Sequence, residues 1–200
     1  MTSPMESNKT GIIILAAGES SRLGYPKQIA QYKEKTLLQH AIDAALGAKV
    51  EKQVLVLGAN KDEIKKTFRG DSIPNIPNQD WEKGMASTMQ KGLDYLLKFE
   101  APDQVIIMLC DMPFVDSKLL KKLIAAQKKT GKGIVACEYS DTVGVPILFT
   151  KAYFKELKAL TGDEGAKKVA QAHEDDCALV KFPMGKVDVD TEEDLRDLNL

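Results

Sequence analysis

The sequence has few of the residues that build disulfide frameworks or zinc sites. It contains three cysteines, Cys110, Cys137 and Cys177, which are widely spaced and form no Cys-x-x-Cys pair. Its two histidines, His40 and His173, add no recognisable ligand spacing. A disulfide-stapled fold and a structural zinc site are therefore excluded, and we expect the cysteines to be small buried hydrophobes.

An excess of charge and long apolar runs are also absent. The 200 residues carry 28 basic and 29 acidic side chains, for a net charge of −1, which argues against an electrostatic nucleic-acid binder. No apolar run approaches the roughly 18 residues that cross a bilayer, and Met1–Thr10 has no signal-peptide core. We therefore expect a cytoplasmic protein with no membrane partner, made of a loose leader over 1–10 and a single domain over 11–200.

Short apolar runs alternate with helical patterns along the chain. The runs predict strands and lie at 12–17, 53–57, 104–109 and 133–137, with later strands at 146–149 and 178–181, which we expect toward the sheet edge. Helical spacing predicts helices over 36–46, 60–68, 85–99, 117–129 and 191–198. Pro146 is expected only at the start of a strand, and Asp190 and Glu193 as a capping pair. The alternation predicts a three-layer α/β domain with a mostly parallel sheet.

In such sheets ligands bind beyond the carboxyl ends of the strands, so the loop after the first run is informative. Here Gly18 and Gly24 permit turns, Ser20 supplies a hydroxyl, and Arg22 and Lys27 supply two cations. Backbone N–H groups and cations together form an anion cradle. The spacing fits neither the P-loop nor the Gly-x-Gly-x-x-Gly pattern, which leaves an ordinary polar loop as the alternative to a different kind of phosphate site.

The segment from Leu15 to Lys27, which reads Leu-Ala-Ala-Gly-x-Ser-x-Arg-Leu-Gly-x-Pro-Lys, resembles the signature loop of the molybdenum cofactor nucleotidyltransferases, the MobA/MocA-like NTP transferases. It is most similar to the cytidylyltransferase group. Further segments resemble later motifs of the family in the same order; they lie at 78–88, 111–113, 144–149, 162–167 and 188–195. The resemblance covers about residues 11–197 and implies a Rossmann-like fold of the nucleotide-diphospho-sugar transferase type.

The resemblance implies a nucleotide site and a Mg²⁺ site. The nucleotide-binding residues would be Leu15, Ala16, Ala17, Gly18, Ser20, Arg22, Lys27, Gly84, Ser87 and Thr88. Asp111 follows a buried run, where a carboxylate suits Mg²⁺, although a turn or cap is its alternative role. Asp188 and Asp190 alternate along an extended segment, so both could approach the metal. One of them would join Asp111, with Asp190 slightly favoured, and Arg22, Lys27 and Asp111 would be catalytic.

The assignments around the helix that begins near residue 85 are weaker. Gly84, Ser87 and Thr88 would read a base edge or an anion at its N-terminus, with plain helix capping as the alternative. Trp81 would stack on the acceptor or simply cover the cleft. The resemblance also places Asp163 and Gly165 near the acceptor.

The expected reaction moves a nucleoside monophosphate onto the terminal phosphate of a molybdopterin-type acceptor and releases pyrophosphate. CTP is favoured over GTP because Ala16-Ala17-Gly18 resembles the cytidylyl members. Alternatives are a guanylyltransferase of the same pathway and a sugar-phosphate or methylerythritol-phosphate nucleotidyltransferase. A non-catalytic nucleotide-binding cofactor chaperone is the alternative from another class. The protein partner that the resemblance implies is a molybdoenzyme or its chaperone.

Overall fold

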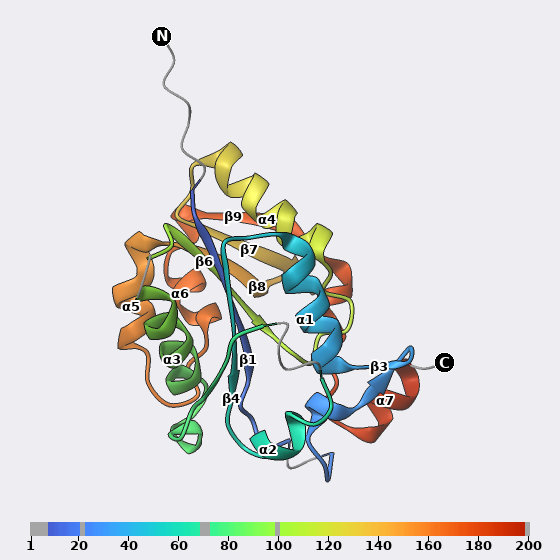
Figure 1. Cartoon of the computed structure of the whole chain (residues 1–200). Helices are drawn as coiled ribbons and strands as arrows, with labels where there is room; N and C mark the ends of the chain where they lie inside the picture. Colours follow the sequence, from blue (N-terminus) through green and yellow to red (C-terminus); the bar gives the residue numbers. More distant parts are fainter. Residues whose placement is uncertain (1–7, 21–22, 69–72, 99–100, 199–200) are drawn as a thin grey trace.

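The computed structural model describes residues 8–20, 23–68, 73–98 and 101–198. Within these ranges the chain forms a seven-stranded sheet in the order β5-β4-β1-β6-β8-β7-β9 (Figure 1). The strands are β1 (Thr10–Ala16), β4 (Lys52–Leu57), β5 (Asn75–Pro77), β6 (Gln104–Leu109), β7 (Ile134–Tyr139), β8 (Thr142–Thr150) and β9 (Cys177–Lys181). Only β8 runs against its neighbours, so the predicted mostly parallel α/β sheet is confirmed.

Helices cover both faces of the sheet, as Figure 1 shows. One face carries α1 (Leu37–Ala48) and α4 (Ser117–Thr130), and the other carries α3 (Met85–Leu97), α5 (Phe154–Ala159) and α6 (Ala166–Ala172). Because side chains alternate along a strand, Ile12 and Ile14 of β1 pack against the first face, while Ile13 and Leu15 pack against the second. This two-sided burial explains why the central strands are continuous apolar runs.

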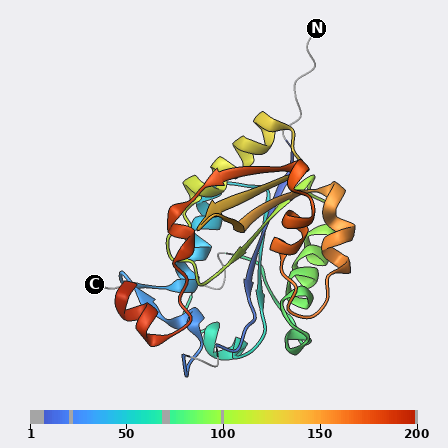
Figure 2. The ribbon, with the colours of Figure 1, turned by 180° about the vertical axis from the view of Figure 1, so that it is seen from behind.

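The C-terminal helix α7 (Glu192–Leu198) lies beside a small hairpin formed by β2 (Gln31–Tyr32) and β3 (Lys35–Thr36), as both ribbon views show (Figure 2). Leu195 and Leu198 pack there against a cluster that includes Tyr32, Leu37 and the fully buried Val189. This contact brings the segment before α7 close to the loop after β1, although the two are far apart in the sequence.

The strand order reverses between β1 and β6. From β1 the chain adds β4 and β5 on one side and then returns to place β6 on the other. In open α/β sheets ligands bind at such a switch point, beyond the carboxyl ends of the strands. The loops after β1 and β6 therefore position the site.

Several expectations about single elements were wrong. Pro146 lies inside β8 and not at its start, and β8 is an interior strand and not an edge strand. The pairing of β7 and β8 is irregular here, since Ala136 pairs with Ile147 while Cys137 pairs with Gly144. The missing N–H of Pro146 therefore falls where the regular ladder is interrupted. Strand β9 is at the edge, as expected.

Helix α2 (Lys61–Ile64) ends earlier than the predicted 60–68, while β5 and α5 were not predicted. The other helices match their predicted ranges to within a few residues, and β1 begins at Thr10, the last residue of the predicted leader. No helix in the described part of the chain is long and apolar enough to span a membrane. The division into a leader and one domain stays a prediction.

Candidate active site at the carboxyl ends of β1 and β6

The loop after β1 is tied down by Gln28, whose side chain is only 1% exposed. Its Nε2 donates to the carbonyl oxygens of Ala16 and Gly18, each at 3.1 Å. On the other side of the loop, the backbone N–H of Lys27 donates to the Ser20 hydroxyl at 3.0 Å. These bonds fix the two ends of the loop relative to each other. Sequence reasoning missed Gln28, because a buried amide that binds loop carbonyls leaves no pattern in the sequence.

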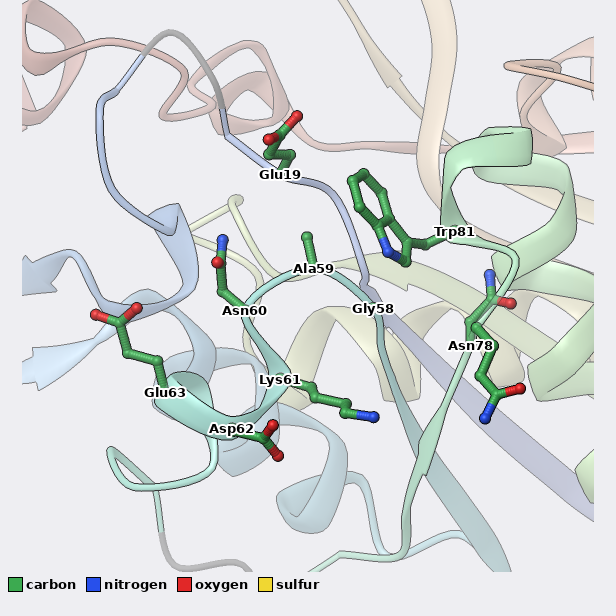
Figure 3. Close-up of a pocket in the computed structure, with 10 residues that line it drawn as sticks. Glu19, Gly58, Ala59, Asn60, Lys61, Asp62, Glu63, Asn78 and Trp81 are labelled. Atoms are coloured by element: carbon green, nitrogen blue, oxygen red, sulfur yellow. The ribbon is translucent and has the colours of Figure 1, made fainter.

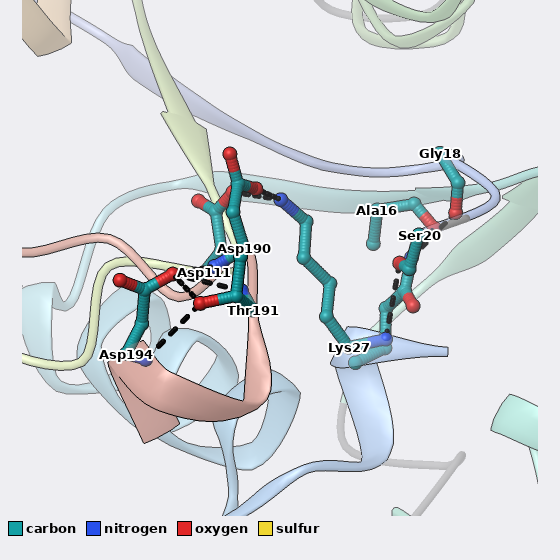
Figure 4. Close-up of polar contacts among 9 residues, drawn as sticks. Ala16, Gly18, Ser20, Lys27, Asp111, Asp190, Thr191 and Asp194 are labelled. Atoms are coloured by element: carbon teal, nitrogen blue, oxygen red, sulfur yellow. Dashed lines mark hydrogen bonds and ion pairs between the residues drawn. The ribbon is translucent and has the colours of Figure 1, made fainter. Parts of the chain in front are cut away.

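The Lys27 side chain contacts both Asp111 and Asp190 (Figure 4). Its Nζ lies 2.5 Å from Asp111 Oδ2 and 2.8 Å from Asp190 Oδ1. Burial disfavours the charged amine, but the Asp111 carboxylate and the hydrogen bonds to both carboxylates outweigh this, so the pKa of Lys27 is raised. Three segments that are distant in the sequence thus meet at one ammonium group.

Asp111 lies two residues after the end of β6 and is 6% exposed. Its Oδ2 binds Lys27, while its buried Oδ1 has no hydrogen-bond partner among the described residues. A buried carboxylate oxygen without a donor is costly unless a cation or water completes its coordination. Oxygen ligands of this kind suit a hard divalent cation, so Asp111 and Asp190 fit such a cation, although the Lys27 ammonium now lies between them.

Asp190 and Asp188 occupy different positions relative to this centre. Val189 between them is fully buried and donates its backbone N–H to the Asp111 carbonyl, which aligns the segment with the end of β6. Asp190 binds Lys27, whereas Asp188 is exposed and lines a separate pocket beside α7. Some loss of hydration beside the protein surface, together with the negative charges of Asp111 and Asp190, raises the pKa of Asp188. The described residues contain no group of three or more His, Cys, Asp or Glu side chains arranged to hold a metal.

The predicted capping pair of Asp190 and Glu193 was wrong. Helix α7 is capped by Thr191 and Asp194: the Asp194 carboxylate accepts from Thr191 N at 2.8 Å, and Asp194 N donates to Thr191 Oγ1 at 3.2 Å. This reciprocal arrangement is a capping box shifted by one residue. As Figure 4 shows, it leaves the Asp190 side chain pointing toward Lys27.

The N-terminus of α3 is organised by Asn78, which is 3% exposed. Its Nδ2 donates to Ser87 Oγ at 2.9 Å and to Thr88 Oγ1 at 3.1 Å. The Ser87 hydroxyl also lies 2.8 Å from the Gly84 carbonyl, and Thr88 is buried. Ser87 and Thr88 therefore act first within the protein, where they fix this turn beside the cleft.

The loop over 162–165 packs directly on this turn. Ala86 N donates to the Gly162 carbonyl at 3.0 Å. Gly84 has φ +91° and ψ −177°, and a Cβ there would lie 2.4 Å from the Gly162 carbonyl carbon and oxygen. Gly165 begins α6, and Asp163 is exposed. The structure therefore brings together the predicted base-binding segment and two of the three predicted acceptor residues.

A pocket of about 600 Å³ opens beside the loop after β1 (Figure 3). Its lining comes from the loops that follow β1, β4 and β5: Glu19, Gly58, Ala59, Asn60, Lys61, Asp62, Glu63, Asn78, Gln79 and Trp81. Gly58 lets the loops approach closely, since a Cβ there would lie 2.6 Å from Ala17 O and 2.7 Å from Trp81 Cβ. The residues from Gly58 to Glu63 were not predicted as site residues. They follow the second apolar run, and ligands of parallel sheets bind beyond the carboxyl ends of the strands, so their position could have indicated this role.

The remaining predicted residues have simple positions. Leu15, Ala16 and Ala17 are buried, so they offer the cleft their backbone only, and Ala17 O accepts from Ala59 N at 3.1 Å. Gly18 is exposed and Ser20 is half-buried. Trp81 lines the pocket. Arg22 lies outside the described residues.

Many nucleotide-binding transferases are three-layer α/β domains with charged side chains grouped at the switch point of the sheet. The family model for the MobA-like NTP transferase domain matches residues 12–177. The chain therefore belongs to the MobA-like NTP transferase family. The predicted family is confirmed at this level, and its cytidylyltransferase subgroup stays a prediction.

Solved structures agree with this assignment. Rv0371c from Mycobacterium tuberculosis H37Rv is 30% identical with a TM-score of 0.84, and the match covers 97% of this chain and 98% of that chain. A complex of Rv0371c with manganese is 27% identical with a TM-score of 0.78, covering 95% and 97% of the two chains. The predicted fold type is confirmed by these neighbours.

Among curated proteins, the bifunctional protein GlmU of Buchnera aphidicola subsp. Schizaphis graminum is 28% identical over 149 residues. The match covers 74% of this chain and 32% of that protein. The chain thus spans about a third of the length of the curated relatives it matches.

Proposed function

We propose that the protein is a Mg²⁺-dependent nucleotidyltransferase that moves CMP from CTP onto the terminal phosphate of a molybdopterin-type acceptor. The observation that carries the proposal is the convergence of Lys27, Asp111 and Asp190 beside the loop after β1. A metal–triphosphate complex needs cations for its phosphates and carboxylates for its metal, and both are present here.

In the proposed reaction, an oxygen of the acceptor phosphate forms a bond to the α-phosphorus of the triphosphate. The bond from the α-phosphorus to the bridging oxygen breaks, and pyrophosphate leaves with the electron pair. A phosphate nucleophile is already ionised near neutral pH, so no general base is required. The described residues around Lys27 accordingly supply charge and position, which are the main requirements of phosphoryl transfer.

Each residue of the cluster has a proposed task. The loop after β1, with Gly18 and Ser20, would hold the phosphates through its backbone, and Lys27 and Arg22 would neutralise them. Asp111 and Asp190 would hold Mg²⁺, which when bound neutralises charge on the phosphates. Asp111 is the better placed ligand because its Oδ1 is buried and unpartnered.

The pocket beside Trp81 is the proposed site for the nucleoside. It adjoins the loop after β1 through Glu19, the residue next to Ser20, whose hydroxyl accepts from Lys27 N. With the nucleoside bound there, the phosphates of the triphosphate would lie along the loop after β1, toward Lys27. Gly84 and Ser87 form the neighbouring turn, which makes them the proposed contacts for the base edge.

The choice of CTP and of the molybdopterin-type acceptor depends on the resemblance of Ala16-Ala17-Gly18 to cytidylyl members. A guanylyltransferase and a sugar-phosphate or methylerythritol-phosphate nucleotidyltransferase use the same chemistry on other substrates. A non-catalytic cofactor chaperone would need only to bind nucleotide, and the buried carboxylate beside a lysine favours an enzyme.

The test is pyrophosphate release measured with each of the four triphosphates and a panel of acceptors. We expect release with CTP, Mg²⁺ and molybdopterin together, and none without the acceptor or the metal. Release with GTP but not CTP would overturn the cytidylyl assignment. Binding of CTP without release for any acceptor would favour the chaperone.

A further inference from the structure

The ammonium group of Lys27 lies where a metal ion would lie if Asp111 and Asp190 were its ligands. It contacts Asp111 Oδ2 at 2.5 Å and Asp190 Oδ1 at 2.8 Å. The three side chains are 19%, 8% and 32% exposed, respectively, so water screens the interaction only in part. One of the two negative charges of the carboxylate pair is therefore balanced from within the protein.

A divalent cation would meet a different charge in the two positions of Lys27. With Lys27 in place the cluster carries one net negative charge; with Lys27 withdrawn it carries two. A divalent ion competes poorly with an ammonium already held by both carboxylates, because like charges at this separation repel strongly. Metal binding through the two oxygens that now hold the ammonium, Asp111 Oδ2 and Asp190 Oδ1, therefore requires that the lysine side chain move.

The backbone of Lys27 is held in place, whereas its side chain is long and flexible. Lys27 N is bonded to Ser20 Oγ at 3.0 Å, and the 3₁₀ turn over Lys27–Ile29 follows directly. The four-carbon stem is flexible, so the ammonium can turn from the carboxylates to phosphates bound along the same loop. A triphosphate offers it a replacement for the contacts it gives up.

We propose that Lys27 closes the metal site of the nucleotide-free protein and opens it when a triphosphate draws its ammonium onto the phosphates. The inference rests on the proposed function, since it takes the phosphate-bearing substrate from there. The two ligands are therefore coupled. Bound nucleotide raises the affinity for metal by more than the phosphate oxygens that coordinate the metal would do alone. Bound metal raises the affinity for nucleotide by the same factor.

The test is Mn²⁺ binding to the protein without nucleotide, followed by the electron paramagnetic resonance signal of free Mn²⁺. We expect Lys27→Met to bind Mn²⁺ at least about tenfold more tightly than the unmodified protein, because the internal cation is gone. Lys35→Met is the matched control, since it removes an exposed ion pair with Asp43 of 2.6 Å and should leave Mn²⁺ binding unchanged. The double variant Lys27→Met/Asp111→Asn should lose the gain, which assigns the bound ion to this site.

A second measurement covers the case in which Lys27→Met is poorly stable. Mn²⁺ should raise the Tm of Lys27→Met and of Lys27→Gln by more than it raises that of the unmodified protein, since ligand binding to the folded state stabilises it. A saturating CTP analogue with a methylene bridge between the α- and β-phosphates should raise Mn²⁺ affinity by a larger factor in the unmodified protein than in Lys27→Met. Equal or weaker Mn²⁺ binding by both variants overturns the proposal.

The outcome is separable from that of the proposed function. Unchanged Mn²⁺ affinity with normal pyrophosphate release by the unmodified protein would overturn the closing role of Lys27 and leave the enzyme assignment standing. Tighter Mn²⁺ binding by Lys27→Met with no release from any triphosphate would confirm the closing role and contradict the transferase.

Discussion

The side chain of Lys27 reaches from the loop after β1 to carboxylates that follow β6 and precede α7. Its position and that of Asp111 could be predicted, because both residues follow buried strands where a parallel sheet binds ligands. The ion pairs among Lys27, Asp111 and Asp190 could not be predicted, because they depend on how α7 packs against the β2–β3 hairpin. The alternation of Asp188 and Asp190 predicted that both side chains face the metal site. In the structure Asp190 binds Lys27, and the backbone hydrogen bond from Val189 to Asp111 holds the segment in the position that allows this.

Replacement of Lys27 by alanine should lower kcat by about 10²–10³, the usual effect of removing one preorganised donor that stabilises transition-state charge. The measurement is steady-state pyrophosphate release, with far-ultraviolet circular dichroism to show that the fold persists. Lys35→Ala, which removes an exposed lysine paired with Asp43, should keep normal activity. Normal turnover in Lys27→Ala would make this lysine a structural cation only.

Asp111→Asn should shift the Mg²⁺ dependence of the reaction to concentrations at least about tenfold higher, because the amide is a weaker ligand than a carboxylate for a hard cation. The measurement is a Mg²⁺ titration of initial rates at saturating nucleotide. Asp43→Asn, at an exposed ion pair outside the site, is the control. An unaltered titration in Asp111→Asn would place the metal elsewhere.

At the scale of elements, the long strands and helices could be predicted from their apolar patterns, and the short ones could not. Strand β5 has three residues and α5 has six, which is too short for a periodic pattern to emerge. Pro146 lies inside β8 because the pairing with β7 is irregular there, and only the tertiary pairing reveals this. The observed capping pair of α7, Thr191 and Asp194, lies one residue after the predicted pair. The sequence could not separate the two pairs, because both have the same spacing.

The turn at Gly84 gives a test of how the loop over 162–165 is held. Gly84→Ala should destabilise the protein by roughly 2–4 kcal/mol, because it adds a clash with the Gly162 carbonyl to an unfavourable φ. Gly131→Ala is the matched control, since Gly131 has φ +69° but nothing within 4 Å of an added Cβ. Its cost should stay near 1 kcal/mol. Denaturant unfolding measures both, and equal costs would contradict the packing of the two loops.

At the scale of the whole molecule, the near balance of charges conceals local order. The 28 basic and 29 acidic side chains leave a net charge of −1, yet a lysine and two aspartates gather at one point of the sheet. The composition could not reveal this grouping, because the grouping arises from the strand order. The two hydrophobic clusters lie on opposite faces of one sheet and share Leu109 and Val145 at their margins.

This shared sheet predicts one cooperative unfolding transition. Far-ultraviolet circular dichroism follows all the helices, whereas fluorescence follows Trp81, the single tryptophan, at the pocket. The two signals should give the same midpoint in denaturant, since both clusters depend on the same strands. Separate midpoints would mean that the region around the pocket unfolds on its own.

The most direct test of the account is the product formed when the purified protein is mixed with Mg²⁺, CTP and molybdopterin. Mass spectrometry of the acceptor, with pyrophosphate measured in the same sample, identifies the transferred group. The account predicts an acceptor heavier by one CMP and an equal amount of pyrophosphate. An unmodified acceptor with CTP, together with a GMP adduct from GTP or no pyrophosphate from any triphosphate, would contradict it.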